Sequence, residues 1–112
     1  MSICMLVAGA GAVQAADPFP TKPIRWVLPV AAGNAGDVIA RWMVEKMTPV
    51  LGQPIIIDNR PGAGGMLALG VVAAAPPDGY TIALVGPAMA ITLATKPPLP
   101  FDPRTPVPIT QL

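Results

Sequence analysis

The sequence predicts an α/β fold, in three layers, with a parallel sheet and helices against its faces. Three observations support this prediction: short apolar runs rich in β-branched residues, longer segments with helix-like apolar spacing, and turns of glycine and proline between them. The segments alternate as strand, helix, strand, helix and strand, an order that favours right-handed crossovers and parallel pairing. Because 53% of the 112 residues are hydrophobic and only 12% are charged, the composition argues against a disordered chain.

The first strand is predicted over residues 24–30, an apolar run with a single charged residue. A turn rich in small residues follows at 33–36, and Asp37 is the expected N-cap of a helix that runs to about Thr48, before Pro49. Apolar residues recur along this helix at i, i+4, i+8 and i+11, which predicts the stripe that packs on the sheet. The members of the stripe are Ile39, Met43, Met47 and Val50.

The later elements are predicted from the same signals. A second strand is expected over residues 54–58, a second helix of small and apolar residues over 66–75, and a third strand over 80–85. Turns that contain glycine and proline separate them. A short helix is expected near residues 89–94. The proline-rich segment 97–112 is expected to be extended, because proline restricts the residue before it to non-helical backbone.

Residues 1–16 have features of a secretory signal peptide. An apolar segment of small residues ends in Val13-Gln14-Ala15, which fits the small-x-small pattern before a cleavage site. A disordered or helical N-terminal extension is the alternative, since the first basic residue is Lys22 and no positive region precedes the apolar segment. Cleavage there would remove Cys4, the only cysteine, and a mature chain without cysteine suits an oxidising compartment such as the periplasm.

The composition also argues against several classes of function. A net charge of +1 and 4% aromatic residues provide neither the basic face nor the stacking platform that nucleic-acid binding needs. Histidine is absent, and the six carboxylates form no acid–base pair or metal-ligand cluster at a sensible spacing. The sequence therefore predicts a protein that is not an enzyme, with no catalytic residues, no metal and no cofactor.

The glycine-rich segment 59–65 resembles a phosphate loop only superficially. No Lys-Ser or Lys-Thr follows its glycines, and Leu67 stands where a dinucleotide fingerprint needs its third glycine. Arg60 within the segment is expected to be solvated or locally paired. A phosphate- or nucleotide-using α/β enzyme is for these reasons the weakest of the alternatives.

Three loops follow the predicted strands, at residues 31–36, 59–65 and 86–89. In open α/β sheets the carboxyl ends of the strands form the edge where ligands bind. The first loop has the most suitable chemistry, because small residues allow close approach to the backbone and a helix N-terminus donates N–H groups to carboxylates or phosphates. The alternative is a tight strand–helix turn with an aspartate cap.

Six ordered motifs resemble the substrate-binding proteins of tripartite tricarboxylate transporters, the Bug or TctC family. They are PTKPIR (20–25), AAGxxxDVIAR (31–41), LGQP (51–54), DNRPGAGG (58–65), PDGYT (77–81) and LPFDP (99–103). The resemblance implies a type II periplasmic binding protein fold, of which residues 17–96 would form a partial first lobe. Residues 97–112 would then lead toward a second lobe that the chain does not contain.

The same resemblance implies a periplasmic protein that captures small carboxylates and delivers them to the membrane permease subunits of a tripartite transporter. It assigns ligand contacts to the first loop and to the loop after the third strand. These residues are Ala32, Gly33, Asn34, Ala35, Gly36 and Asp37, and then Gly86, Pro87, Ala88 and Met89. Within this set, Asp37 is expected to act more as a helix cap than as a ligand contact. The alternative is a truncated, non-binding fragment of the family.

Overall fold

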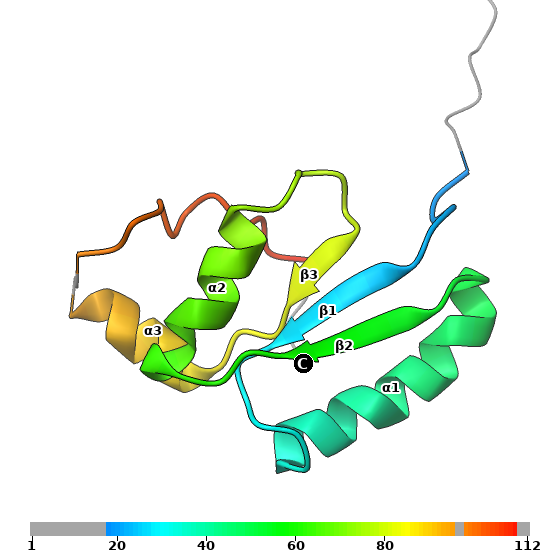
Figure 1. Cartoon of the computed structure of the whole chain (residues 1–112), viewed down its shortest axis with the longest axis horizontal. Helices are drawn as coiled ribbons and strands as arrows, with labels where there is room; N and C mark the ends of the chain where they lie inside the picture. Colours follow the sequence, from blue (N-terminus) through cyan, green and yellow to red (C-terminus); the bar gives the residue numbers. More distant parts are fainter. Residues whose placement is uncertain (1–17, 96–97, 110–112) are drawn as a thin grey trace, which may run out of the picture.

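The computed structural model of the protein describes residues 18–95 and 98–109. At its centre is a three-stranded parallel sheet in the order β2-β1-β3 (Figure 1). The strands are β1 (Ile24–Leu28), β2 (Ile55–Asn59) and β3 (Thr81–Ala83). β1 lies between the other two, with Ile24 opposite Ile55 on one side and Arg25 opposite Thr81 on the other. The predicted parallel sheet is confirmed.

Helices lie against both faces of the sheet, as the sequence predicts. α1 (Ala35–Leu51) packs on one face, and α2 (Met66–Ala73) contacts β1 and β3 from the other (Figure 1). A short 3₁₀ turn, η1 (Ala63–Gly65), precedes α2, and α3 (Pro87–Ala94) follows β3. Successive side chains of β1 point to opposite faces, so that Trp26 joins the core beneath α1, whereas Val27 is fully buried on the other side.

The larger core lies between α1 and the sheet. Its buried members are Ile24, Trp26, Leu28, Ala40 and Ile55, and Met43, Val44, Met47 and Leu51 of α1 pack against them. The predicted stripe of α1 is wrong at both ends, because Ile39 is 57% exposed and Val50 is 84% exposed. The helix is rotated so that Asp37 and Ala40 face inward. A hydrogen bond from β2 to the Asp37 side chain fixes this rotation, and residues three or four positions further along fall on the same face.

The start and the end of α1 both differ from expectation. Asn34, not Asp37, is the N-cap: its backbone is extended, and its Oδ1 accepts a hydrogen bond from the N–H of Gly36 at 3.1 Å. The helix continues through Pro49 and ends before Gly52, which adopts the left-handed conformation common after a helix. A proline so close to the end removes one hydrogen bond, a loss that the packing of the last turn offsets.

Replacing the N-cap tests this assignment. The Asn34→Ala variant is expected to be about 1 kcal/mol less stable than the parent, because the Gly36 N–H loses its acceptor. Asn34→Ser is the matched control, since a serine hydroxyl can cap the same N–H, and its loss should be a few tenths of that value. Urea unfolding followed by circular dichroism measures both. Equal stability of the alanine variant and the parent would contradict the cap.

Other element boundaries move by a few residues for local reasons. β1 ends at Leu28 rather than at residue 30, because Pro29 has no N–H to donate to the ladder. α2 ends at Ala73 rather than at 75, where the following prolines disfavour helical backbone. α3 begins earlier than predicted, at Pro87, since proline suits the first helical position.

The described part of the proline-rich segment, residues 98–109, forms neither helix nor strand. Two of its side chains, Leu99 and Phe101, pack against a second core formed by Met66, Leu69 and Met89. The predicted signal peptide, residues 1–16, lies outside the described residues. Within 18–95 and 98–109, no helix combines the length and the apolar character that crossing a membrane would require.

At the amino edge of the sheet, the segment before β1 is tied to the start of β3. The Tyr80 hydroxyl accepts a hydrogen bond from the Thr21 N–H at 2.9 Å, and the Lys22 ammonium lies 4.3 Å from the centroid of the tyrosine ring. Lys22 also pairs with Asp78 at 3.1 Å. The motifs PTKPIR and PDGYT thus meet at the end of the sheet opposite the candidate ligand loops.

Candidate ligand-binding site at the carboxyl edge

The loops that follow the three strands border a groove of about 400 Å³ at the carboxyl edge of the sheet. Its lining residues are Pro29 and Val30 after β1, Gly62, Gly64 and Gly65 after β2, and Gly86, Pro87, Ala88 and Met89 after β3. None of these described residues carries a charged side chain. An anion in the groove would therefore be held by backbone N–H groups and by the positive ends of helices.

The structure separates the two groups of predicted ligand residues. The residues of the loop at 86–89 all line the groove. The loop at 32–37 lies beside the groove and does not line it, and its residues from 32 to 35 are exposed. Ligand contact by either group remains a prediction.

Sequence reasoning missed five lining residues, which are Pro29, Val30, Gly62, Gly64 and Gly65. A signal existed for the three glycines, because they follow a predicted strand, whereas Pro29 and Val30 were placed inside the first predicted strand. The glycine-rich loop at 59–65 was expected at the ligand edge, but no ligand contacts were assigned to it after its phosphate-loop motif failed. Its position at the strand ends was the better guide, since parallel strands bring all of their following loops to one edge.

The glycines after β2 allow close packing of the backbone. Gly65 has φ 91°, and a Cβ there would lie 2.8 Å from Met89 Cε and 3.4 Å from Pro29 Cβ. Because glycine lacks this Cβ, η1 can pack closely against the start of α3, and the two segments form one wall of the groove. Arg60 just before these glycines bonds to Asp58 at 2.9 Å, which confirms the expected local pairing. The DNRPGAGG motif therefore has a packing role in this fold.

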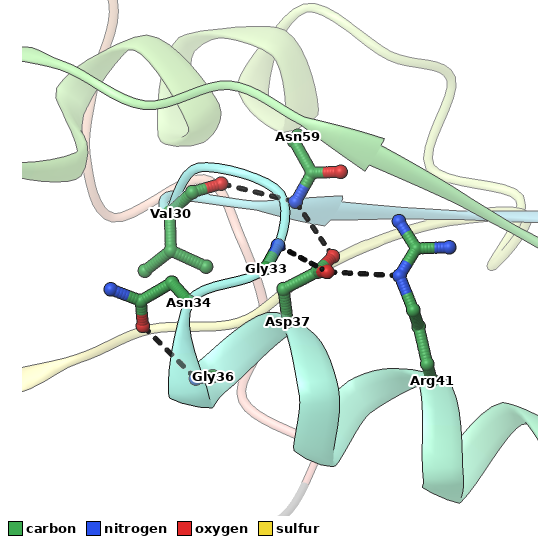
Figure 2. A network of polar contacts seen from close by, with 7 residues as sticks. All are labelled: Val30, Gly33, Asn34, Gly36, Asp37, Arg41 and Asn59. Carbon is green, nitrogen blue, oxygen red and sulfur yellow. Dashed lines mark hydrogen bonds and ion pairs between the residues drawn. The ribbon is translucent and has the colours of Figure 1, made fainter.

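A polar network closes the loop between β1 and α1 (Figure 2). The Asp37 side chain is only 2% exposed. Its Oδ2 accepts hydrogen bonds from the Gly33 N–H and from Arg41 Nε, both at 2.9 Å, and its Oδ1 accepts one from Asn59 Nδ2, also at 2.9 Å. Asp37 thus ties the loop to its own helix and to β2. The role of N-cap predicted for it belongs to Asn34.

The network fixes the charge of Asp37. The hydrogen bond from Arg41, followed by those from Gly33 and Asn59, holds the pKa of the Asp37 carboxyl far below its usual range. The same contact raises the pKa of Arg41. Asp37 is therefore ionised at neutral pH, in the first turn of α1, where negative charge is favoured.

Only part of the loop backbone is left to bind an anion. The Gly33 N–H is bonded to Asp37 and the Gly36 N–H to Asn34. Among the described residues, the N–H groups of Ala32 and Ala35 donate to no other protein group. Within the predicted set, these two exposed residues offer donors through which the first loop could contact a carboxylate, and the N–H of Ala31 just before them is also unbonded. The described residues contain no group of three or more acidic or cysteine side chains that could hold a metal ion.

A parallel sheet flanked by helices, with an uncharged groove at its carboxyl edge, defines part of a lobe of the periplasmic binding protein class. Comparison with known sequences gives the family. A sequence profile of the tripartite tricarboxylate transporter family receptor, TctC, matches residues 39–112. The chain belongs to this family, and the resemblance seen in its six motifs is confirmed.

Individual relatives agree with this assignment. A UPF0065 protein of Bordetella pertussis is 45% identical over 93 residues, a match that covers 83% of this chain and 28% of the relative. The structure of MatC from Rhodopseudomonas palustris with bound malate is 40% identical, with a TM-score of 0.67 over 76% of this chain and 29% of that one. R. palustris Rpa4515 with adipate is 36% identical, with a TM-score of 0.57 over 60% of this chain and 22% of that one. The chain spans between 26% and 32% of the length of the curated relatives it matches.

Proposed function

We propose that this chain supplies first-lobe elements of a periplasmic solute-binding protein that captures small carboxylates and delivers them to the permease subunits of a tripartite tricarboxylate transporter. Membership of the receptor family supports the proposal, as do relatives whose structures contain malate and adipate. The observation that carries it is the groove at the carboxyl edge, which all three strand-following loops border. Export to the periplasm through residues 1–16 is part of the same proposal.

The groove has the chemistry for a short aliphatic acid. Pro29, Val30 and Met89 offer an apolar wall for methylene groups. α3 begins at this groove, and because Pro87 lacks an N–H, Ala88 offers the first donor of that helix. A carboxylate placed there would meet the positive end of α3 while the exposed donors of Ala32 and Ala35 lie to one side. The described residues offer no acid–base pair beside the groove, so we propose capture and release without chemical change.

Titration with adipate tests the proposal, and 1,6-hexanediol is the matched control because it has the same carbon chain without charge. In nuclear magnetic resonance spectra of the 15N-labelled chain, adipate should shift the amide signals of Gly86, Ala88 and Met89 and those of Ala32 and Ala35. The diol should not. Because the groove is open, we expect a dissociation constant on the order of 1 mM.

Malate is the second ligand for this titration, and citrate, glutamate and benzoate extend the panel to other carboxylates. Shifts confined to residues far from the carboxyl edge would contradict the proposed site. No shift with any carboxylate would favour the alternative that this chain is a non-binding member of the family.

A further inference from the structure

We propose that Asn59 is a positioning residue that sets the shape of the loop between β1 and α1; its importance for ligand capture rests on the function proposed above. The Asn59 side chain donates both hydrogens of its amide. One goes to the carbonyl oxygen of Val30 at 3.1 Å, and the other to Oδ1 of Asp37 at 2.9 Å. Val30 is where the loop leaves the sheet, and Asp37 lies in the first turn of α1. A single side chain of β2 therefore holds both ends of the loop (Figure 2).

The contact extends to the middle of the loop through Asp37. Its Oδ2 accepts the Gly33 N–H, and Gly33 has φ 83°, the left-handed region that turns the chain back toward the helix. Figure 2 shows the Gly33 N–H, the Asn59 amide and Arg41 converging on this carboxylate. The side chains of residues 31–33 are methyl groups or hydrogen, so they cannot hold the loop through polar contacts of their own. Its conformation depends on the acceptor that Asn59 keeps in place.

The residue type at position 59 is determined by its partners. A carbonyl and a carboxylate can only accept, and the asparagine amide offers two donors at the end of a short side chain. Aspartate would place a second carboxylate beside Asp37, and leucine would leave both acceptors without this donor. Position 59 also lies on the strand face of Ile55 and Ile57, which pack toward α1.

The charged groups around the network are few. Arg41 is the cation that contacts Asp37. Asp58 lies on the opposite face of β2, where Arg25 and Arg60 both bond to it. The pH response of the loop is therefore expected to come from Asp37, because Arg41 stays charged and Asn59 is neutral. Fixing this loop before a ligand arrives lowers the entropy cost of binding at Ala32 and Ala35.

The Gly33 amide resonance tests the coupling without any ligand. In the parent, its pH titration reports the depressed pKa of Asp37, because the two groups share a hydrogen bond. In Asn59→Leu we expect the midpoint to move up toward the ordinary aspartate range and adipate affinity to fall about tenfold, the effect of losing a charge-assisted hydrogen bond. Tyr80→Phe is the control. It removes the acceptor of the Thr21 N–H at the other edge of the sheet, so it should lower stability and leave both readouts unchanged.

Asn59→Asp gives a second test, in which lowering the pH should move the Gly33 signal back toward that of the parent. This test remains informative should the leucine variant not fold. At pH 8 its two neighbouring carboxylates repel and the Gly33 signal should differ from that of the parent. Toward pH 5 they can share a proton, which restores one donor, so the signal should return toward the parental position. A parental Gly33 signal at both pH values in Asn59→Asp and in Asn59→Leu would overturn the proposal. Failure of the parent to bind adipate would contradict the proposed function but not the role of Asn59, since the Gly33 signal is measured without ligand.

Discussion

The Asp37→Ala variant is expected to melt roughly 10 °C or more below the parent protein. The substitution removes the acceptor of three hydrogen bonds at once, from Gly33, Arg41 and Asn59. It also leaves a cavity beneath the first turn of α1 and breaks the contact that fixes the rotation of the helix on the sheet. Differential scanning calorimetry or circular dichroism at pH 7 measures the midpoint.

Asp102→Ala is the matched control for this experiment. Asp102 also pairs with an arginine, Arg104 at 3.1 Å, but its side chain is 52% exposed and its partners lie within its own turn. Exposed ion pairs contribute little to stability, so the midpoint should change by only a few degrees. A loss at Asp102 equal to that at Asp37 would contradict the assignment of the larger role to the buried network.

The pH dependence of the Asp37 contribution has a definite sign. Because its pKa is depressed in the folded protein, the stabilisation is fully present above the unfolded pKa of about 4 and is lost as the pH falls below it. The gap in melting temperature between the parent and Asp37→Asn should therefore be constant from pH 7 to pH 5 and shrink from about pH 4 downward. The pKa values of Asp58, Asp78 and Asp102 are also lowered, by Arg25, by the Tyr80 N–H and by Arg104 as their main partners. These groups are present in both proteins, and their effects cancel in the difference. A difference in melting temperature between the two proteins that grows as the pH falls would contradict the stabilising role of the ionised Asp37.

We expect the substitution Gly64→Ala to destabilise the protein more than Gly52→Ala does. Gly64 has φ 61°, and a Cβ there would overlap Oγ1 of Thr92 on α3. The left-handed backbone alone costs a non-glycine residue about 1 to 2 kcal/mol, and the overlap adds to that cost by pushing α3 away from η1. We expect the free energy of unfolding of Gly64→Ala, measured with urea, to fall by roughly 3 kcal/mol or more.

Two companion variants separate backbone strain from overlap. Gly52 has φ 68°, but a Cβ there would meet nothing within 4 Å, so Gly52→Ala should lose only about 1 kcal/mol. Thr92→Ala removes the overlapping atom, and the double variant Gly64→Ala/Thr92→Ala should be more stable than the sum of the two single losses predicts. If the losses of the two single variants simply add in the double variant, the alanine at position 64 and the Thr92 side chain do not clash.

Much of the fold could be predicted because it depends on local patterns. The apolar runs at 24–30, 54–58 and 80–85 each overlap a strand, and turn residues separate them from helices. The parallel pairing follows from the alternation of strands and helices alone. Membership of the receptor family was likewise readable from six short motifs in a fixed order. The loop at 86–89 was placed at the ligand edge for the same reason, since it follows a parallel strand.

Details of α1 were not predictable in the same way. Apolar spacing favoured a stripe through Ile39 and Val50, yet both are exposed. The sequence contains a competing line through Ala40 and Leu51, and periodicity cannot rank two apolar lines on one helix. A carboxylate in the first turn suggested a cap, but the same residue type can also serve a buried network. The choice depended on what lies opposite, on β2.

Spacing and turn chemistry were enough to predict the class of fold and the order of the elements, because these features arise from neighbours along the chain, and the resemblance of six motifs indicated the family. The rotation of α1, the occupant of the Gly33 N–H and the lining of the groove depend instead on distant partners. Asp37 and Asn59 stand 22 residues apart in sequence, and their hydrogen bond forms only when β2 pairs with β1. Such contacts are fixed by the assembled sheet, and for this reason the sequence indicated a candidate ligand loop while the folded structure defined which of its N–H donors are already bonded.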